Sequence, residues 1–235
     1  MPDEFGGFPA ASQQFLAELA ANNRREWFQE QRERYQRELL APAQDFCVAL
    51  GKRLQAISPG IRCDPRANGQ GSLLRINRDT RFSNDKSPYK TVVGMLFWEG
   101  PGKKMAHPAF GFELSAAGAR MMAGMFAFDK AMLAAYRLAV ADERRGAELE
   151  RAAAALRAAG NYEIQGQRTV RVPADYAADH PRAEWLKYKN LYASLPPIPT
   201  ERITSPELVD HCYALCEGAA PLFRWLVSIQ AGALN

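Results

Sequence analysis

The chain has 235 residues, of which 47% are hydrophobic and 24% charged, and its formal net charge is +4. This composition is ordinary for a globular protein, and the length suits one hydrophobic core better than two. No apolar run approaches the roughly 20 residues that a bilayer span requires, and the mild basicity argues against a dedicated nucleic-acid-binding domain.

The first residues, Met1–Phe5, carry neither a basic n-region nor an apolar h-region, so no secretory signal is expected. The cytoplasm is therefore the expected location. The four cysteines are scattered without a Cys-x-x-Cys spacing, so a disulfide framework is not expected. Cys212 and Cys216 lie four residues apart, but they also fit an apolar helix stripe and no second ligand pair occurs, so neither a metal nor another cofactor is expected.

The N-terminal third predicts three helices, because apolar residues recur there near the helical period of 3.6. The three stripes are Phe15, Leu16 and Leu19; Trp27, Phe28, Tyr35 and Leu39; and Phe46, Leu50, Leu54 and Ile57. Asn22-Asn23 ends the first helix. Pro42 suits the first turn of the third helix, where a missing N–H has no helical partner to lose.

The centre of the chain predicts strands, because apolar runs and alternating patterns are separated there by short turn-prone segments. The expected strands are Ile61–Arg66, Ser72–Asn77, Thr91–Trp98, Phe110–Leu114 and Arg120–Phe126. Short connections between consecutive strands favour an antiparallel meander over crossover units.

The last hundred residues return mostly to helix. The expected helical stripes are Met132, Leu133, Tyr136 and Val140; Leu149, Ala153 and Leu156; and a helix that starts at Ser205-Pro206. Pro221 predicts a break or a kink in that last helix. Two short strands are expected around Tyr162–Ile164 and Arg168–Val172. Helices, then strands, then helices indicate an α+β fold, with a central mainly antiparallel sheet flanked by the N- and C-terminal helices.

The most unusual stretch is Arg75–Lys90, which packs five cations, two carboxylates and a tyrosine into sixteen residues. The wider window Arg62–Lys90 has a net charge of +4, which is the charge of the whole chain. The basicity is therefore local, and a local cationic cluster on a short loop indicates an anion-binding site. Guanidinium forks suit bidentate contact with phosphate or carboxylate groups, and Ser87-Pro88 restricts the backbone that carries them.

In this hypothesis the anion-binding residues are Arg75, Arg78, Arg81, Lys86, Tyr89 and Lys90. The three arginines hold the anion, the two lysines add positive charge, and the tyrosine donates a hydrogen bond. Asp79 orients an arginine. The opposing interpretation is a surface loop whose charges pair internally, Asp79 with Arg78 or Arg81, and Asp85 with Lys86. The cation excess favours the anion site over that interpretation.

A second constellation is Asp179-His180 ahead of Pro181. A histidine beside an aspartate suits a general base with its orienting carboxylate. Adjacent side chains rarely reach the geometry that this pairing needs, and an aspartate before a proline-started helix is a good cap. We therefore expect Asp179 to cap a helix and His180 to be structural.

Whether the bound anion is also turned over is left open by the residues. No nucleophile motif and no phosphate-binding glycine-rich loop ahead of a Lys-Ser/Thr pair occurs in the chain. If the protein is an enzyme, the candidate catalytic residues are Asp79, Asp85 and His180, since a general acid or base must lie near the bound anion.

The motif Arg75-x-x-Arg78-Asp79-x-Arg81-Phe82-x-x-x-Lys86-x-x-Tyr89 resembles the signature of domain-of-unknown-function family 2461, a bacterial family. The resemblance extends to three further pieces of the chain. These are Gly7-Phe8-Pro9, Asn22-Asn23 before Trp27-Phe28, and Asp179-His180-Pro181 ahead of Trp185-Leu186-Lys187. The resemblance implies a single domain over residues 1–235 and brings no activity with it.

The preferred hypothesis is a protein that binds a phosphate- or carboxylate-bearing small molecule at the Arg75–Lys90 loop. One alternative is a nucleic-acid-binding module, in which Phe82, Tyr89 and Trp98 stack on bases between the cations. Another is an interaction protein whose arginine loop docks an acidic partner. No membrane partner is expected, and the sequence does not give the oligomeric state. The salt dependence of binding distinguishes the small-molecule hypothesis from the nucleic-acid alternative, since nucleic-acid binding falls steeply with salt concentration.

Overall fold

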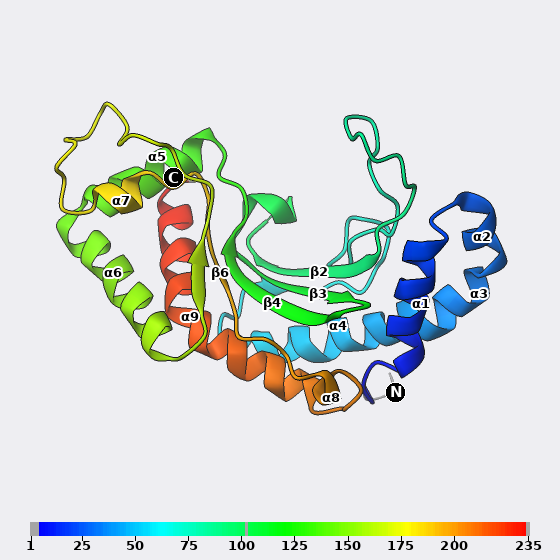
Figure 1. Ribbon diagram of the computed structural model, residues 1–235. Coiled ribbons are helices and arrows are strands. Elements are labelled where there is room, and N and C mark those ends of the chain that lie inside the picture. The colour runs from blue at the N-terminus through cyan, green and yellow to red at the C-terminus, as the bar shows by residue number, and fades with distance from the viewer. Residues whose placement is uncertain (1–4, 102, 234–235) are drawn as a thin grey trace. The chain divides into compact units, whose positions relative to one another are not determined.

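The computed structural model describes residues 5–101 and 103–233 and has an α+β fold (Figure 1). Within these residues the strands form a six-stranded antiparallel sheet in the order β1-β2-β3-β4-β6-β5. The strands are β1 Ile61–Arg62, β2 Val92–Glu99, β3 Ala109–Ser115, β4 Gly118–Met125, β5 Glu163–Gln165 and β6 Leu191–Ser194. The predicted fold class, a largely antiparallel sheet between two helical regions of the chain, is confirmed.

Helices precede and follow the central strands along the chain. Those before the strands are α1 Ala10–Ala21, α2 Arg25–Glu30, α3 Arg32–Arg34, the π-helical turn η1 Tyr35–Leu40 and α4 Ala41–Leu54. A short 3-10 turn, η2 Lys104–Ala106, lies between β2 and β3. The later helices are α5 Lys130–Ala141, α6 Glu143–Ala158, α7 Ala183–Leu186, α8 Thr200–Ile203 and α9 Leu208–Ala233.

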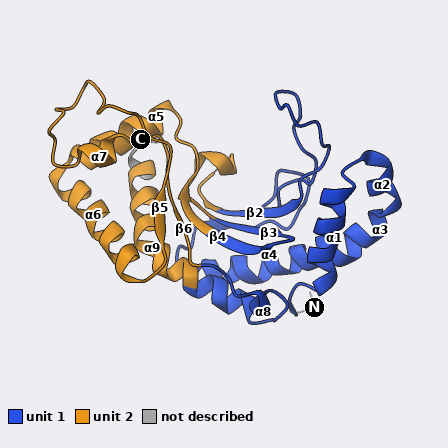
Figure 2. Ribbon diagram, in the orientation of Figure 1, with its two compact units in different colours: residues 1–97, 111–121, 197–214 blue, residues 98–110, 122–196, 215–235 orange. Residues whose placement is uncertain are grey.

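The chain divides into two compact units, which are coloured separately in Figure 2. Unit 1 consists of residues 1–97, 111–121 and 197–214, and unit 2 of residues 98–110, 122–196 and 215–235. The chain passes between the units several times, and β3, β4 and α9 each contribute residues to both. No linker therefore separates the two units in sequence. That residues 1–235 form a single cooperative domain stays a prediction.

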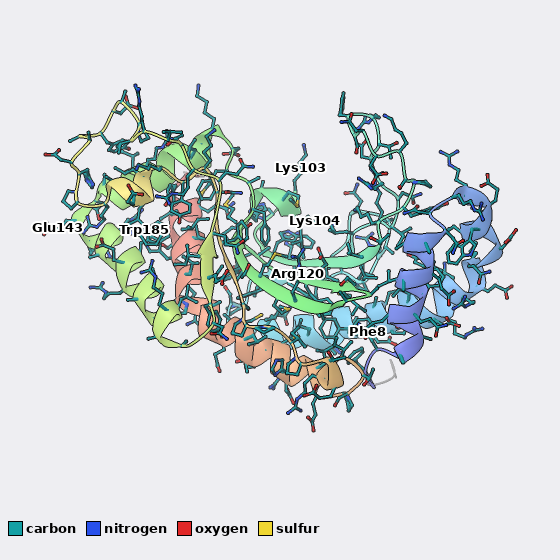
Figure 3. The ribbon with its side chains drawn as sticks, viewed as in Figure 1. Phe8, Lys103, Lys104, Arg120, Glu143 and Trp185 are labelled. Carbon is teal, nitrogen blue, oxygen red and sulfur yellow. The ribbon has the colours of Figure 1, made fainter. Side chains whose placement is uncertain are left out.

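The core of unit 1 is a cluster of phenylalanine rings. Phe8, which is labelled in Figure 3, Phe46 of α4 and Phe112 of β3 are all buried. The ring centroids of Phe46 and Phe112 are 4.5 Å apart, and Phe8 stacks on Phe112 at 6.0 Å. Aromatic rings bury large apolar areas and gain further from offset or edge contacts. The cluster therefore fixes the N-terminal segment and α4 against the sheet.

The helical segments η1 and α4 are continuous with each other around Pro42. Since proline has no N–H, the carbonyl of Glu38, four residues earlier, loses its helical donor. Ser12 of α1 replaces that donor, because its Oγ donates to the Glu38 carbonyl at 2.5 Å. The π-helical turn η1 ends directly before α4, in whose first turn Pro42 lies. The predicted position of Pro42 is confirmed, but no break separates the second and third helical segments.

Two helices of unit 2, α5 and α6, begin at capping aspartates. Asp129 accepts a hydrogen bond from the backbone N–H of Met132 at 2.8 Å and starts α5. Asp142 accepts one from the N–H of Arg145, also at 2.8 Å, and starts α6. Each carboxylate accepts a hydrogen bond from one of the free N–H groups at a helix start. Its negative charge also interacts favourably with the positive end of the helix dipole.

Buried polar aromatic groups tie these helices together. The hydroxyl of Tyr136 on α5 donates to the carbonyl of Trp185 at 2.8 Å. The indole N–H of Trp225 on α9 donates to the carbonyl of Arg145 at 2.9 Å. Both bonds satisfy a polar atom that burial would otherwise leave without a partner. They fix α7 to α5 and α9 to α6.

Two predicted strands before β2 are shorter than expected. In place of Ile61–Arg66, only Ile61–Arg62 is a strand, because Asp64 accepts a hydrogen bond from the N–H of Arg66 at 3.0 Å and turns the chain. In place of Ser72–Asn77, only isolated bridges form, between Leu73 and Met95 and between Asn77 and Tyr89.

The C-terminal half differs from expectation at three places. Of the predicted strand Arg168–Val172 only Arg168 pairs, since the hydroxyl of Thr169 bonds the carbonyl of Arg171 at 2.7 Å and bends the chain. Strand β6, which pairs with both β4 and β5, was not predicted. Of the predicted break or kink at Pro221, the break is wrong, because α9 continues through the proline, and the kink stays a prediction.

Candidate anion site

The Arg75–Lys90 loop is a long excursion between β1 and β2 that closes on a narrow base (Figure 1). Asn77 and Tyr89 form an isolated antiparallel bridge. On either side of it, the N–H of Arg78 donates to the Pro88 carbonyl at 2.9 Å and the N–H of Lys90 donates to the Ile76 carbonyl at 2.8 Å. The first and last residues of the cationic stretch are therefore brought together, while residues 79–87 project from the base.

Tyr89 anchors this base to the helical region. Its side chain is 5% exposed, and its ring stacks on Phe28 of α2 with centroids 4.1 Å apart. The amide side chain of Asn23 donates to the Tyr89 carbonyl at 2.9 Å and accepts from the Tyr89 N–H at 3.1 Å. The ring of Tyr89 belongs to the core. Its role as a hydrogen-bond donor to a ligand stays a prediction.

Two internal ion pairs organise the projecting part of the loop. Arg81 binds Asp79 through Nε at 2.9 Å and Nη2 at 2.6 Å. Arg78 binds Asp85, which also accepts from the N–H and hydroxyl of Ser87 at 2.9 and 2.6 Å. The expected pair of Asp79 with Arg81 is present.

Asp85 pairs with Arg78 and not with Lys86. Lys86 instead donates from Nζ to the carbonyl of Thr80 at 3.0 Å. The expected pairing of Asp85 with Lys86 is therefore wrong, because the bend at Asp85–Ser87 turns the carboxylate toward the opposite limb of the loop. Each limb now contributes one charge to the pair that joins them.

The two aspartates are held firmly in their ionised forms. The bonds from Arg81 lower the pKa of Asp79 to about 2. The hydroxyl and N–H of Ser87, followed by Arg78, lower the pKa of Asp85 to about 2. A group with so low a pKa is a poor general acid or base near neutral pH, where an effective catalytic group has a pKa close to the ambient pH. As candidate catalytic residues, both fit an orienting role better.

Arg75 and Lys90 form the least compensated part of the loop. Lys90 donates from Nζ to the backbone carbonyl of Arg75 at 3.0 Å. Burial, and then the positive charge of Arg75, lower the pKa of Lys90. Among the described residues neither side chain forms an ion pair with a carboxylate, although Asp79 is within electrostatic reach of Arg75. Two cations thus lie within electrostatic reach of each other at the base of the loop.

The ion pairs leave donors free on the other two arginines. A guanidinium carries five N–H donors in a fixed fork. Arg81 uses Nε and Nη2 for Asp79, and Arg78 uses Nη1 for Asp85. Each pair therefore restricts an arginine rotamer while keeping N–H groups available for a second acceptor.

His180 lies in unit 2, whereas the loop belongs to unit 1. Its Nδ1 accepts a hydrogen bond from the backbone N–H of Arg182 at 3.0 Å, just before α7 begins at Ala183. The expected helix cap, Asp179, makes no such bond, because the turn at Pro181 brings the imidazole to the helix start instead. This capping bond supports the structural role predicted for His180.

One aromatic side chain of the loop is open to solvent. Phe82 is 95% exposed, with the Arg81 guanidinium 5.8 Å from its ring centroid. Tyr89 and Trp98, each 5% exposed, are buried and cannot present a ring to a nucleic-acid base. Of the three aromatic residues on which the nucleic-acid alternative relied, only Phe82 is therefore available for stacking.

Within residues 5–101 and 103–233, no three His, Cys, Asp or Glu side chains cluster so as to hold a metal ion. In the same residues no helix is both long enough and apolar enough to cross a bilayer. No disulfide joins any of the four cysteines to another described residue, and burial raises the pKa of Cys47 to about 12.

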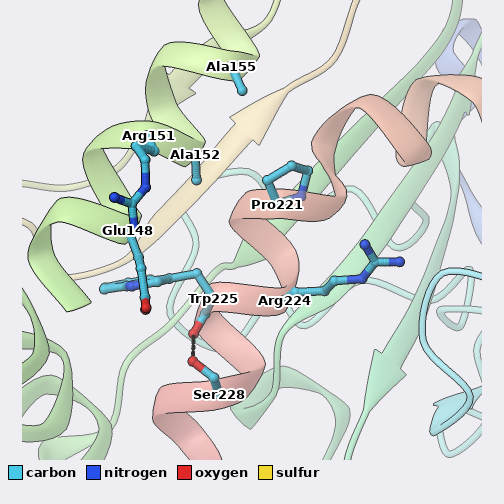
Figure 4. Close-up of a pocket in the computed structure, with 8 residues that line it drawn as sticks. All are labelled: Glu148, Arg151, Ala152, Ala155, Pro221, Arg224, Trp225 and Ser228. Atoms are coloured by element: carbon cyan, nitrogen blue, oxygen red, sulfur yellow. Dashed lines mark hydrogen bonds between the residues drawn. The ribbon is translucent and has the colours of Figure 1, made fainter. Parts of the chain in front are cut away.

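Two pockets in unit 2 involve residues that were not predicted as site residues. One, of about 470 Å³, is lined by residues of α6 and α9, among them Arg151, Arg224 and Trp225, and the Trp225 ring extends toward α6 (Figure 4). The other, of about 400 Å³, lies between α6 and the α7–Tyr188 segment. No run of charged residues in the sequence marks either pocket, because the residues that line it come from segments far apart in the chain.

Comparison with protein-family models matches residues 11–225 to the family described as "Conserved hypothetical protein (DUF2461)". No curated protein and no solved structure matches the chain.

Proposed function

The chain belongs to this family, and from that premise we propose that it binds a phosphate- or carboxylate-bearing small molecule at the base of the Arg75–Lys90 loop. The observation that carries the proposal is the position of Lys90, whose Nζ donates to the Arg75 backbone carbonyl and whose pKa is lowered by burial and by the charge of Arg75. Folding alone gains nothing from two neighbouring cations, since their repulsion costs stability. An anion between them removes that repulsion. We also propose that the protein acts in the cytoplasm.

The roles of the loop residues follow from their contacts. Arg75 supplies a guanidinium fork for two oxygens of the anion, and Lys90 a point charge. Arg78 and Arg81, held by their aspartates, offer remaining N–H groups from the projecting limbs. Lys86 adds positive charge at the rim. Asp79 and Asp85 position arginines, and no proton transfer is assigned to them.

The alternative with a specific observation in its favour is the docking of an acidic protein partner. The exposed ring of Phe82, beside the Arg81 guanidinium, suits an interface that buries an apolar contact next to a charge. A small anion at Arg75 and Lys90 does not need that ring. Phe82→Ser therefore leaves anion binding unchanged if the proposal is right.

The test is calorimetric titration with inorganic phosphate, pyrophosphate and citrate. Arg75→Ala and Lys90→Met should each weaken binding by about tenfold, the effect of one lost charge-assisted contact. Arg120→Ala is the matched control, because Arg120 is another arginine of unit 1, paired with Glu113 at 2.7 Å. Equal affinities for Arg75→Ala and Arg120→Ala, or no binding of any of the three anions by the unaltered protein, would refute the proposal.

A proton-linkage measurement gives an independent signature. Since burial and Arg75 depress the pKa of Lys90, an anion bound beside it raises that pKa again. Above neutral pH, binding should therefore take up protons, which appears as a dependence of the binding heat on the ionisation heat of the buffer. The uptake should vanish in Lys90→Met. A weak salt dependence further distinguishes a single anion site from nucleic-acid binding.

A further inference from the structure

A second site lies in unit 2, away from the loop in sequence. A pocket of about 400 Å³ is lined by Glu150, Arg157, Arg168, Glu184, Trp185 and Tyr188. Its volume falls within the roughly 300–1,000 Å³ of small-molecule sites. Glu150 and Arg157 come from one face of α6, seven residues apart, and the other four come from Arg168 and the α7–Tyr188 segment.

The pocket has an aromatic wall. Trp185 and Tyr188 are half-buried, and their rings stack at a centroid distance of 5.7 Å with 27° between their planes. The guanidinium of Arg168 lies 5.0 Å from the Tyr188 ring centroid. The two half-buried rings and the guanidinium thus form a stack, and another planar group can extend it at an exposed ring face.

This wall is held in place by the backbone. The Trp185 carbonyl accepts the buried Tyr136 hydroxyl at 2.8 Å, and Tyr188 forms an antiparallel bridge with Arg168. Gly166 leaves room for the tyrosine, since a Cβ there would come within 2.7 Å of Tyr188 Cδ1. The rings are thus positioned before any ligand arrives, which lowers the ordering cost of binding.

The charges of the pocket favour an anion. Both carboxylates are already engaged, Glu150 with Arg182 at 3.0 Å and Glu184 with Lys187 and Arg168. Arg157 forms no ion pair with any described residue, so the lining and its partners hold four cations against two carboxylates. Occupied carboxylates are poor acceptors for sugar hydroxyls, and an aromatic wall gives free phosphate nothing to contact.

We propose that this pocket binds a nucleoside monophosphate, with its base stacked on the Trp185–Tyr188 wall and its phosphate at Arg157 and Arg168. A planar heteroaromatic ring attached to a phosphate matches both halves of the pocket at once. Stacking on aromatic side chains accepts any base because every base has a π-face. The guanidinium of Arg157 supplies the charge-assisted bonds that hold the phosphate.

The experiment is a calorimetric titration of the full chain carrying Arg75→Ala and Lys90→Met, which remove the proposed phosphate contacts of the loop, with AMP and with adenosine and inorganic phosphate as the two partial ligands. AMP should bind more tightly than either part. Arg157→Ala should weaken AMP binding by about tenfold, and Tyr188→Leu should weaken it while Tyr188→Phe keeps it. Arg151→Ala is the matched control, because Arg151 is an exposed arginine of the same helix that lines the pocket with Trp225 instead.

Three results would overturn the proposal: no AMP binding, equal losses in Arg157→Ala and Arg151→Ala, or phosphate alone binding as tightly as AMP. AMP binding should persist in this Arg75→Ala, Lys90→Met background, which separates the pocket from the loop. Loss of AMP binding there, with binding retained by the unaltered chain, would place the nucleotide at the loop and refute the pocket. If Tyr188→Leu fails to fold, the arginine pair alone still decides the outcome.

Discussion

The two cation-rich segments of this protein close by the same backbone device and use it differently. In unit 1 the bridge between Asn77 and Tyr89 closes the cationic loop, and in unit 2 the bridge between Arg168 and Tyr188 closes the segment that carries α7. Each bridge pairs a tyrosine with a polar residue. Tyr89 turns its ring into the core against Phe28, whereas Tyr188 leaves its ring half-exposed beside Arg168.

The difference lies in the surface that each tyrosine meets. The buried ring of Tyr89 anchors the loop of unit 1. The cations of the loop lie outside the core, where they offer charge and N–H groups. A half-exposed ring in unit 2 joins Trp185 and makes a wall, so the cations around it offer charge beside a planar apolar surface. The burial of one ring therefore distinguishes the proposed site for a bare anion from the proposed site for an aromatic anion.

The largest expected effect concerns the two tyrosines themselves. Tyr89→Ala should lower the free energy of unfolding by about 3–5 kcal/mol, because it removes a fully packed ring. Tyr188→Ala should cost about 1 kcal/mol, since it removes only half-buried aromatic contacts. Urea unfolding followed by circular dichroism measures both. Equal losses would break the comparison, because the two rings would then carry the same structural weight.

A smaller effect on phosphate binding should distinguish a substitution of Lys86 in the loop from a substitution of His180 in unit 2. Lys86→Glu should weaken phosphate binding several-fold, because it reverses a charge at the rim of the proposed site. His180→Gln should leave phosphate binding unchanged, since the imidazole caps a turn in unit 2. Titration calorimetry ranks the two variants. The opposite ranking would move the anion site to the neighbourhood of Asp179 and His180.

The smallest effect is a local opening of the loop in acid. Because the folded-state pKa of Asp79 and of Asp85 is about 2, their contributions to stability are complete above the ordinary carboxyl pKa of about 3.9 and are lost as the pH falls toward 2. The amide signals of Arg81 and Ser87 in NMR spectra should shift in that window. Global unfolding should change little. Shifts centred near pH 4 would show that the pairs do not form in solution.

Much of the fold could be predicted from the sequence because it follows from local spacing. The stripe of Phe15, Leu16 and Leu19 predicts α1, and the apolar run before Trp98 predicts β2, since both periods depend on neighbours in the chain. The excess of cations in Arg75–Lys90 is equally a property of the residues alone. Four-residue β6 carried too little pattern to be predicted, and its pairing with β4 and β5 requires partners distant in the chain.

What the tertiary structure alone decided is which polar and aromatic groups find partners across long separations. Asp85 reaches Arg78 because the loop folds back on itself, and the base of the loop is fixed by Asn23, far earlier in the chain. Trp185 and Tyr188 form a pocket only because α6 lies beside them. A sequence specifies charge and periodicity directly, but burial is a relation between two surfaces, and the second surface is supplied by folding.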